Sequence, residues 1–107
     1  METFEKSKVF IIRNEIDYSK DAVVSKIVTK QPSGNITLFA FDKEQGLSEH
    51  SAPFDALVEV VEGKAEIIID KRSFVLSDGE SIIMPANIPH AVRATERFKM
   101  LLTMIKG

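Results

Sequence analysis

The sequence contains no cysteine among its 107 residues. This absence excludes disulfide bonds, thiolate zinc sites and cysteine nucleophiles, and it is typical of proteins in a reducing compartment, so we expect a cytoplasmic location. An excess of one charge is also lacking, because 14 Lys and Arg oppose 16 Asp and Glu. The near balance leaves no basic surface for nucleic acid and no polybasic segment for an anionic membrane, so neither partner is expected.

Long apolar runs are missing as well. Near the N-terminus the run Val9–Ile12 stops at Arg13, and it is too short for a signal peptide or a membrane span. No internal repeat and no linker-like stretch divides the chain. Hydrophobic residues make up 44% of the sequence, which is enough for one core. We therefore expect residues 1–107 to form a single domain.

The sequence does contain a succession of short runs rich in Val, Ile and Phe, separated by turn residues. Their spacing of about 8–12 residues predicts an all-β sandwich or barrel. The predicted strands are Val9–Ile12, Val23–Thr29, Ile36–Phe41, Ala56–Val61, Ala65–Ile69, Ser73–Leu76, Ser81–Met84, Ala91–Ala94 and Phe98–Ile105. Asp42–Gly46 is expected to be a loop and Glu62-Gly63 a turn. Met and Leu in the last run favour a helix, but its alternation predicts a strand.

Some of these strands are apolar at every position, as in Ile67–Ile69. A strand with one wet face should alternate between apolar and polar residues, so we expect both faces to be covered. One face should fill a barrel interior. The other should pack on the N-terminal strands, residues 9–41, or on a second subunit, and a homodimer is therefore expected.

Histidine is scarce, and the chain has only His50 and His90. Each is expected to lie just before a strand. His90 follows Pro85 and Pro89, which stiffen the backbone. Asn87 lies between the prolines and tolerates the left-handed conformation that a tight turn there requires. This loop is expected to hold the His90 ring in place.

Residues 46–63 and 79–94 resemble the two motifs of the cupin superfamily. The residues that keep the family's spacing are His50 and Val60-Val61-Glu62-Gly63 in the first motif, and Gly79, Pro85, Asn87 and His90 in the second. Asn87 stands where the family has a glycine. The resemblance implies a single double-stranded β-helix (jelly-roll or cupin) barrel, and with its flanking strands it covers most of the chain from Ile36 onward.

The resemblance also identifies what this chain lacks. Cupins bind a divalent metal through three histidines and a glutamate, and the second histidine and the glutamate are replaced here by Ala52 and Ala56. Two imidazoles without a carboxylate make a weak metal site. A divalent transition metal (Zn, Ni, Fe, Mn or Cu) on His50 and His90 is expected to be weakly bound or adventitious.

No other residue is well placed to complete the metal site. Glu49 and Asp55 each lie one position from a ligand place, so the alternation of side chains along a strand directs them away from the pocket. Met84, Met100 and Met104 carry thioethers that could favour Cu(I) beside two imidazoles. Thioethers in apolar strands more often fill a core.

The pocket implied by the resemblance is mostly apolar. The residues expected to line it are His50, Ala52, Ala56, Val58, Met84, His90 and Met100. The two histidines would be its sparse polar groups, as in most small-molecule sites, and their partial protonation would favour a carboxylate or phosphate. We expect a small-molecule-binding barrel with an unassigned ligand.

Two other functions remain open from the sequence. The first is a metal-dependent cupin enzyme of the dioxygenase, isomerase or decarboxylase type, using His50 and His90, or a metal-free enzyme with one histidine as general base. No serine-centred nucleophile elbow and no phosphate-binding glycine loop is present. The second is a structural or regulatory dimer with a vestigial pocket.

Overall fold

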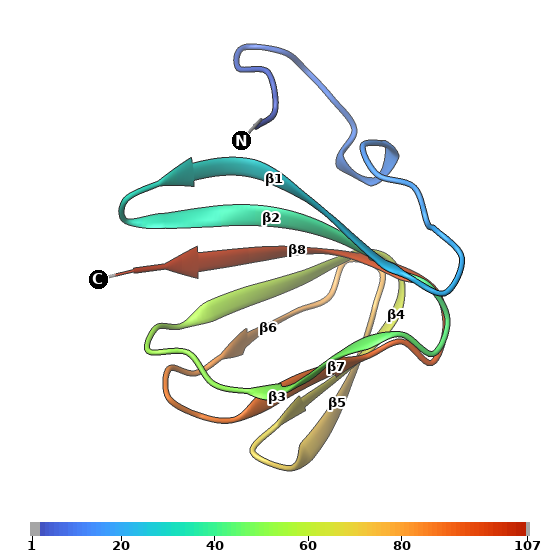
Figure 1. Ribbon diagram of the computed structural model, residues 1–107, viewed down its shortest axis with the longest axis vertical. Coiled ribbons are helices and arrows are strands. Elements are labelled where there is room, and N and C mark those ends of the chain that lie inside the picture. The colour runs from blue at the N-terminus through green and yellow to red at the C-terminus, as the bar shows by residue number, and fades with distance from the viewer. Residues whose placement is uncertain (1–2, 107) are drawn as a thin grey trace.

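Strands dominate the chain, as the spacing of its apolar runs predicts (Figure 1). The computed structural model describes residues 3–106, and within them no helix is long or apolar enough to span a bilayer. The elements are η1 (Ile12–Asn14, a 3-10 helix), β1 (Val23–Gln31), β2 (Gly34–Phe41), β3 (Gly46–His50), β4 (Ala56–Ile69), β5 (Arg72–Ser77), β6 (Ser81–Met84), β7 (His90–Arg93) and β8 (Phe98–Ile105). The predicted all-β class is confirmed, and the Met-rich last run is a strand.

The long strand β4 connects the two halves of the sheet. The strand order is β1-β2-β8-β4-β7-β3, and β5 and β6 also pair with β4. The first half of β4 pairs with β8 and β6, and its second half pairs with β5 and β7. Figure 1 shows β4 bending from one half to the other, so that the sheet curls on itself into a barrel, as expected for a double-stranded β-helix.

The predicted turn at Glu62-Gly63 is wrong, because β4 runs through both residues. The ladder with β8 has a bulge between Val60 and Glu62, and bulges bend a strand without ending it. Gly63 has φ +90°, and a Cβ on it would collide with the carbonyl oxygen of Arg97. The glycine therefore marks a bend in a continuous strand and not a reversal of the chain.

Two further predictions are corrected. Val9–Ile12 is not a strand, since η1 begins at Ile12 and no strand pairs with this segment. Gly46–His50, whose first residue was expected to close a loop, forms β3 through its pairing with the distant β7. Its one apolar residue, Leu47, gives no alternation that could be read from the sequence. His50 thus ends a strand and does not precede one, whereas His90 begins β7.

The main core lies between the two halves of the curled sheet. The rings of Phe41 and Phe98 stack there with their centroids 4.5 Å apart. A second, smaller cluster lies on the outer face of β1, β2 and β8, where Ile16 packs with Leu38 and Ala40. The N-terminal segment, residues 3–20, therefore covers part of the outer face of the sheet.

Polar contacts fasten the N-terminal segment to the sheet. The Tyr18 hydroxyl donates a hydrogen bond to Glu62 Oε2 at 2.7 Å. Lys99 Nζ donates to the Arg13 carbonyl at 2.6 Å and lies 3.6 Å from the same Glu62 oxygen. Both Lys99 and Arg97 stand 5.0 Å from the Tyr18 ring centroid. Burial and the neighbouring Glu62 carboxylate raise the pKa of Tyr18, so the phenol stays protonated and keeps donating.

The bend in β4 gives a paired test with two glycines. Gly63→Ala should lower the free energy of unfolding by about 3 kcal/mol or more, because it adds a backbone collision to the strain of positive φ. Gly79→Ala is the control, since Gly79 has φ +81° with no atom near its missing Cβ, and it should cost about 1–2 kcal/mol. Urea denaturation measures both, and equal losses would contradict the role assigned to Gly63.

Candidate ligand site

The two histidines are brought together by the pairing of β3 with β7, in which His50 and His90 are direct register partners. Asn87 has φ +63°, as its position between the prolines predicts. Its N–H donates to the Ala52 carbonyl at 2.7 Å. This bond fastens the Pro85–Pro89 loop to the segment after β3, so both histidines are held at the same end of the barrel.

The burial of the core side chains falls along β8 from one end of the barrel to the other. Along β8 the residues that pack in the core are fully buried at Phe98 and Met100. They are only half-buried at Leu102 and Met104. We call the end at Met104 the mouth. Met104 pairs with Ala56, which pairs in turn with the last residue of β6, just before the proline loop.

The histidine rings meet through their Nε2 atoms, which are 3.1 Å apart. The His50 Nδ1 atom lies 2.7 Å from the Ser48 carbonyl oxygen, and the His90 Nδ1 atom lies 3.3 Å from the Ile88 carbonyl oxygen. A carbonyl oxygen only accepts hydrogen bonds, so each Nδ1 must carry a hydrogen. In their neutral forms the two rings therefore bring two Nε2 lone pairs close together, with the ring planes at 74°.

Two lone pairs this close repel each other unless a proton, a cation or a ligand hydrogen-bond donor lies between them. One proton converts the contact into an N–H···N hydrogen bond with a single positive charge. Burial, and to a smaller extent His50, lowers the pKa of His90, so His90 is the ring that stays neutral and accepts. A second proton would bring two cations together and is disfavoured.

These residues do not complete a metal site of the cupin kind. Within residues 3–106 no group of three or more His, Cys, Asp or Glu side chains is arranged to hold a metal ion. Glu49 pairs with Lys71 Nζ at 3.0 Å, and Asp55 Oδ1 accepts from the Ala86 N–H at 2.8 Å. Both carboxylates are thus engaged elsewhere, and the alanines at the other two ligand positions offer only methyl groups.

The remaining predicted pocket residues lie at different depths. Ala52 is half-buried in the loop that follows β3. Ala56 and Met84 are buried cross-strand partners beside the mouth. Val58 and Met100 are completely buried in the main core. Val58 and Met100 therefore lie deeper in the barrel than Ala52.

Sequence reasoning missed Asn35 on β2. It pairs with Met104 in the ladder with β8, and its side-chain Oδ1 is buried with no hydrogen-bond partner within the described residues. A buried acceptor without a donor is costly. The signal was present in the alternation of β2, where Asn35 shares its parity with Phe39 and Phe41 and should face the same way.

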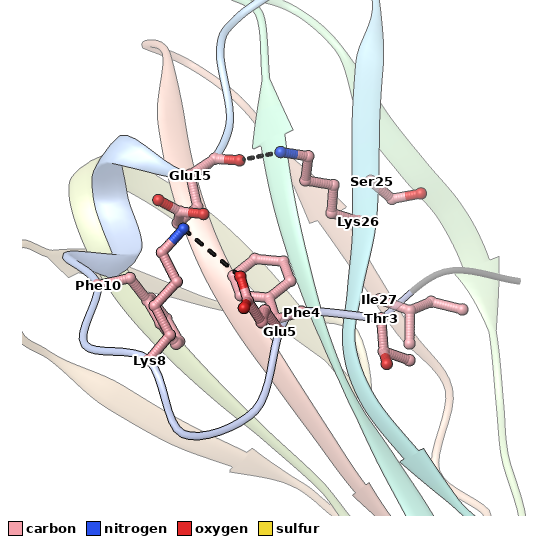
Figure 2. A pocket seen from close by; sticks show the side chains of 9 residues that line it. All are labelled: Thr3, Phe4, Glu5, Lys8, Phe10, Glu15, Ser25, Lys26 and Ile27. Carbon is pink, nitrogen blue, oxygen red and sulfur yellow. Dashed lines mark hydrogen bonds and ion pairs between the residues drawn. The ribbon is translucent and has the colours of Figure 1, made fainter.

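A surface hollow of about 610 Å³ lies away from the histidines, between the N-terminal segment and β1 (Figure 2). We call it the N-terminal hollow. Phe4 and Phe10 form part of its wall, with their ring centroids 5.1 Å apart, and Ser25 and Ile27 of β1 also line it. No predicted site residue contributes to it.

Comparison with known proteins identifies relatives of the same fold. The family described as cupin domain matches residues 37–106. A conserved protein of unknown function from Streptococcus pyogenes is 38% identical, with 99% of this chain and 93% of that chain covered and a TM-score of 0.93. A cupin 2 conserved barrel domain protein from Leptotrichia buccalis is 41% identical over 91% of this chain but only 47% of its own length, with a TM-score of 0.88.

A cupin superfamily protein from Desulfitobacterium hafniense shares the fold at 24% identity, with a TM-score of 0.92 and 99% and 97% of the two chains covered. Among curated proteins, none matches the chain.

The depressed pKa of His90 makes stability depend on pH. The folded protein binds fewer protons than the unfolded chain below the ordinary histidine pKa of about 6.5. The stabilisation that comes from a neutral His90 in the folded protein is therefore complete above that pH. It is lost as the pH falls towards the lowered pKa of His90. The free energy of unfolding should fall more steeply between about pH 7 and 5 in the wild type than in His90→Gln, by at most about 1.4 kcal/mol per pH unit. Urea midpoints at constant ionic strength measure this, and parallel profiles would contradict it.

Proposed function

The chain belongs to the cupin domain family, and we propose that it is a small-molecule-binding barrel whose ligand is held by His50 and His90, with weak or adventitious metal binding at most. The observation that carries the proposal is the 3.1 Å contact between two Nε2 atoms whose Nδ1 partners face carbonyl oxygens. A proton shared by the pair would place one positive charge at this end of an apolar barrel. A carboxylate or phosphate that separates the rings would accept the Nε2–H that otherwise joins them, in a charge-assisted hydrogen bond.

The surroundings support a small anion as the ligand. The mouth offers apolar contacts from Ala56, Met84 and Met104, and sparse polar groups in apolar walls are typical of small-molecule sites. We therefore assign the site to small carboxylates and phosphates.

We also propose that the protein acts as a cytoplasmic homodimer. The lack of cysteine supports the compartment. Large apolar side chains that remain exposed, among them Val9, Ile83 and Ile105, support the dimer, because such groups gather at interfaces.

A metal-dependent cupin enzyme of the dioxygenase, isomerase or decarboxylase type is the second candidate. One observation favours it, since the converging Nε2 lone pairs of His50 and His90 are also suited to a shared cation. Water or substrate would have to supply every other ligand, which weakens binding relative to sites with three or four protein ligands.

A thermal-shift screen of small carboxylates and phosphates tests the binding proposal. At 100 times its Kd a ligand should stabilise the wild type by about 2.7 kcal/mol. His50→Ala and His90→Ala should lose this shift, whereas Val75→Ala, at a 61% exposed position on β5, should keep it. A screen without any histidine-dependent shift would favour the vestigial structural dimer instead.

Metal content of the untagged protein separates the two candidates. We expect Zn, Ni, Fe, Mn and Cu well below one equivalent by mass spectrometry, with little difference between the wild type and His50→Ala, because two imidazoles bind weakly. One equivalent of a single metal that disappears in His50→Ala or His90→Ala would replace the binding proposal with the enzyme.

A further inference from the structure

The two histidines belong to a row of residues that crosses one half of the sheet. His50 of β3 pairs with His90 of β7, and His90 pairs with Ile69 of β4. Ile69 pairs in turn with Arg72, the first residue of β5. Direct register partners present their side chains on the same face of a sheet. Because Ile69 packs in the main core, Arg72 leaves the backbone on the inner face of the sheet, as the histidines do.

The turn between β4 and β5 fixes the position of Arg72. Asp70 and Lys71 both have positive φ, +49° and +67°, as the two central residues of a type I′ hairpin turn require. Such a turn places the residues on either side of it directly opposite each other. The Asp70 N–H donates to the Pro89 carbonyl at 2.9 Å. The hairpin that carries Arg72 is therefore joined to the proline loop that precedes β7.

The charge of Arg72 is not neutralised by the protein's own carboxylates. The ion pairs found within residues 3–106 do not include it, whereas the neighbouring Lys71 is paired with Glu49. The guanidinium carbon of Arg72 lies 5.9 Å from the centroid of the Phe74 ring, and Phe74 packs against the main core. Stacking on an aromatic ring holds a guanidinium in place and leaves its N–H donors available to a ligand.

We propose that Arg72 is the second anchor of the ligand site, and that the ligand is a small acid with two anionic groups. One group binds the histidine pair, and the other accepts paired hydrogen bonds from the guanidinium. Two strand spacings, about 10 Å in all, separate the backbone of Arg72 from that of His90. Their side chains shorten this distance to the length of a small diacid. The inference rests on the proposed small-anion site and specifies its ligand class.

The surroundings of the row suit such a ligand. Ile69 lies between the two anchors and is 9% exposed, so it offers an apolar contact to the carbon chain that joins the anionic groups. Ala56 stands where the metal-binding cupins have a glutamate, and a methyl group does not repel an anion. Glu49 is paired with Lys71 at 3.0 Å, which offsets its charge. Two positive anchors with an apolar residue between them therefore favour a diacid with a hydrocarbon centre.

Isothermal titration calorimetry with matched acids tests the second anchor on the full chain at constant pH and ionic strength. Glutarate is compared with pentanoate, and phosphoglycerate with glycerol phosphate, so that each pair differs in one anionic group. In at least one pair the wild type should bind the acid with two anionic groups about tenfold more tightly, because a hydrogen bond between charged groups is stronger than a neutral one. Arg72→Gln should remove this preference and leave binding of the simpler acid unchanged. Arg72→Lys should restore only part of it, since lysine lacks the bidentate geometry.

Arg93→Gln is the matched control for charge. Arg93 is exposed on β7 next to the buried Val92, so the alternation of the strand places it on the outer face. The variant removes the same charge as Arg72→Gln but should keep the full preference for the acid with two anionic groups. An equal loss of preference in both variants would show an effect of net charge alone and would overturn the second anchor.

The outcomes separate the second anchor from the small-anion site itself. If no acid of either pair binds in a way that His50→Ala abolishes, the site and the second anchor are overturned together. If the acids bind and depend on His50, but the members of each pair bind equally and Arg72→Gln changes neither, the second anchor alone is overturned. Thermal unfolding without ligand monitors the fold of the Arg72 variants. If Arg72→Gln unfolds, Arg72→Lys and the preference of the wild type carry the test.

Discussion

The continuity of β4 through its bend is the constraint on which the rest of the structure depends. A single strand of 14 residues takes part in both halves of the curled sheet, so its bulge at Val60–Glu62 and the positive φ of Gly63 set the angle between the halves. That angle determines where β7 meets β3, and this pairing brings His50 opposite His90. The chemistry of the site is thus coupled to a backbone bend in the middle of β4, whose last residue, Ile69, pairs with His90.

Much of the fold could be predicted from the sequence because strand formation here follows local pattern. Runs of Val, Ile and Phe bounded by turn residues became strands from Val23 to Ile105. The predictions that were wrong concern segments whose structure depends on whether they have a strand to pair with. Val9–Ile12 has the composition of a strand but no partner in the described chain. Gly46–His50 has little strand character but gains a partner that is distant in the sequence.

The site could be predicted as a set of residues but not as a chemical state. Motif spacing gave His50 and His90, and the two alanines indicated an incomplete metal set. Which nitrogen of each ring carries hydrogen depends on the carbonyl oxygen of the residue two positions earlier in the chain. The motif spacing does not show whether that oxygen faces the ring. The same holds for Asn35, whose side-chain oxygen matters because of what surrounds it and not because of its place in a motif.

The hydrogen bond from Tyr18 to Glu62 has a spectroscopic consequence. The chain has no tryptophan and one tyrosine, so this phenol dominates its near-ultraviolet absorption and emission. A carboxylate that accepts the phenolic hydrogen quenches tyrosine fluorescence and shifts its absorption to longer wavelength. Release of the N-terminal segment from the sheet would reverse both changes. The protein therefore carries an intrinsic optical reporter for the docking of its own N-terminal segment.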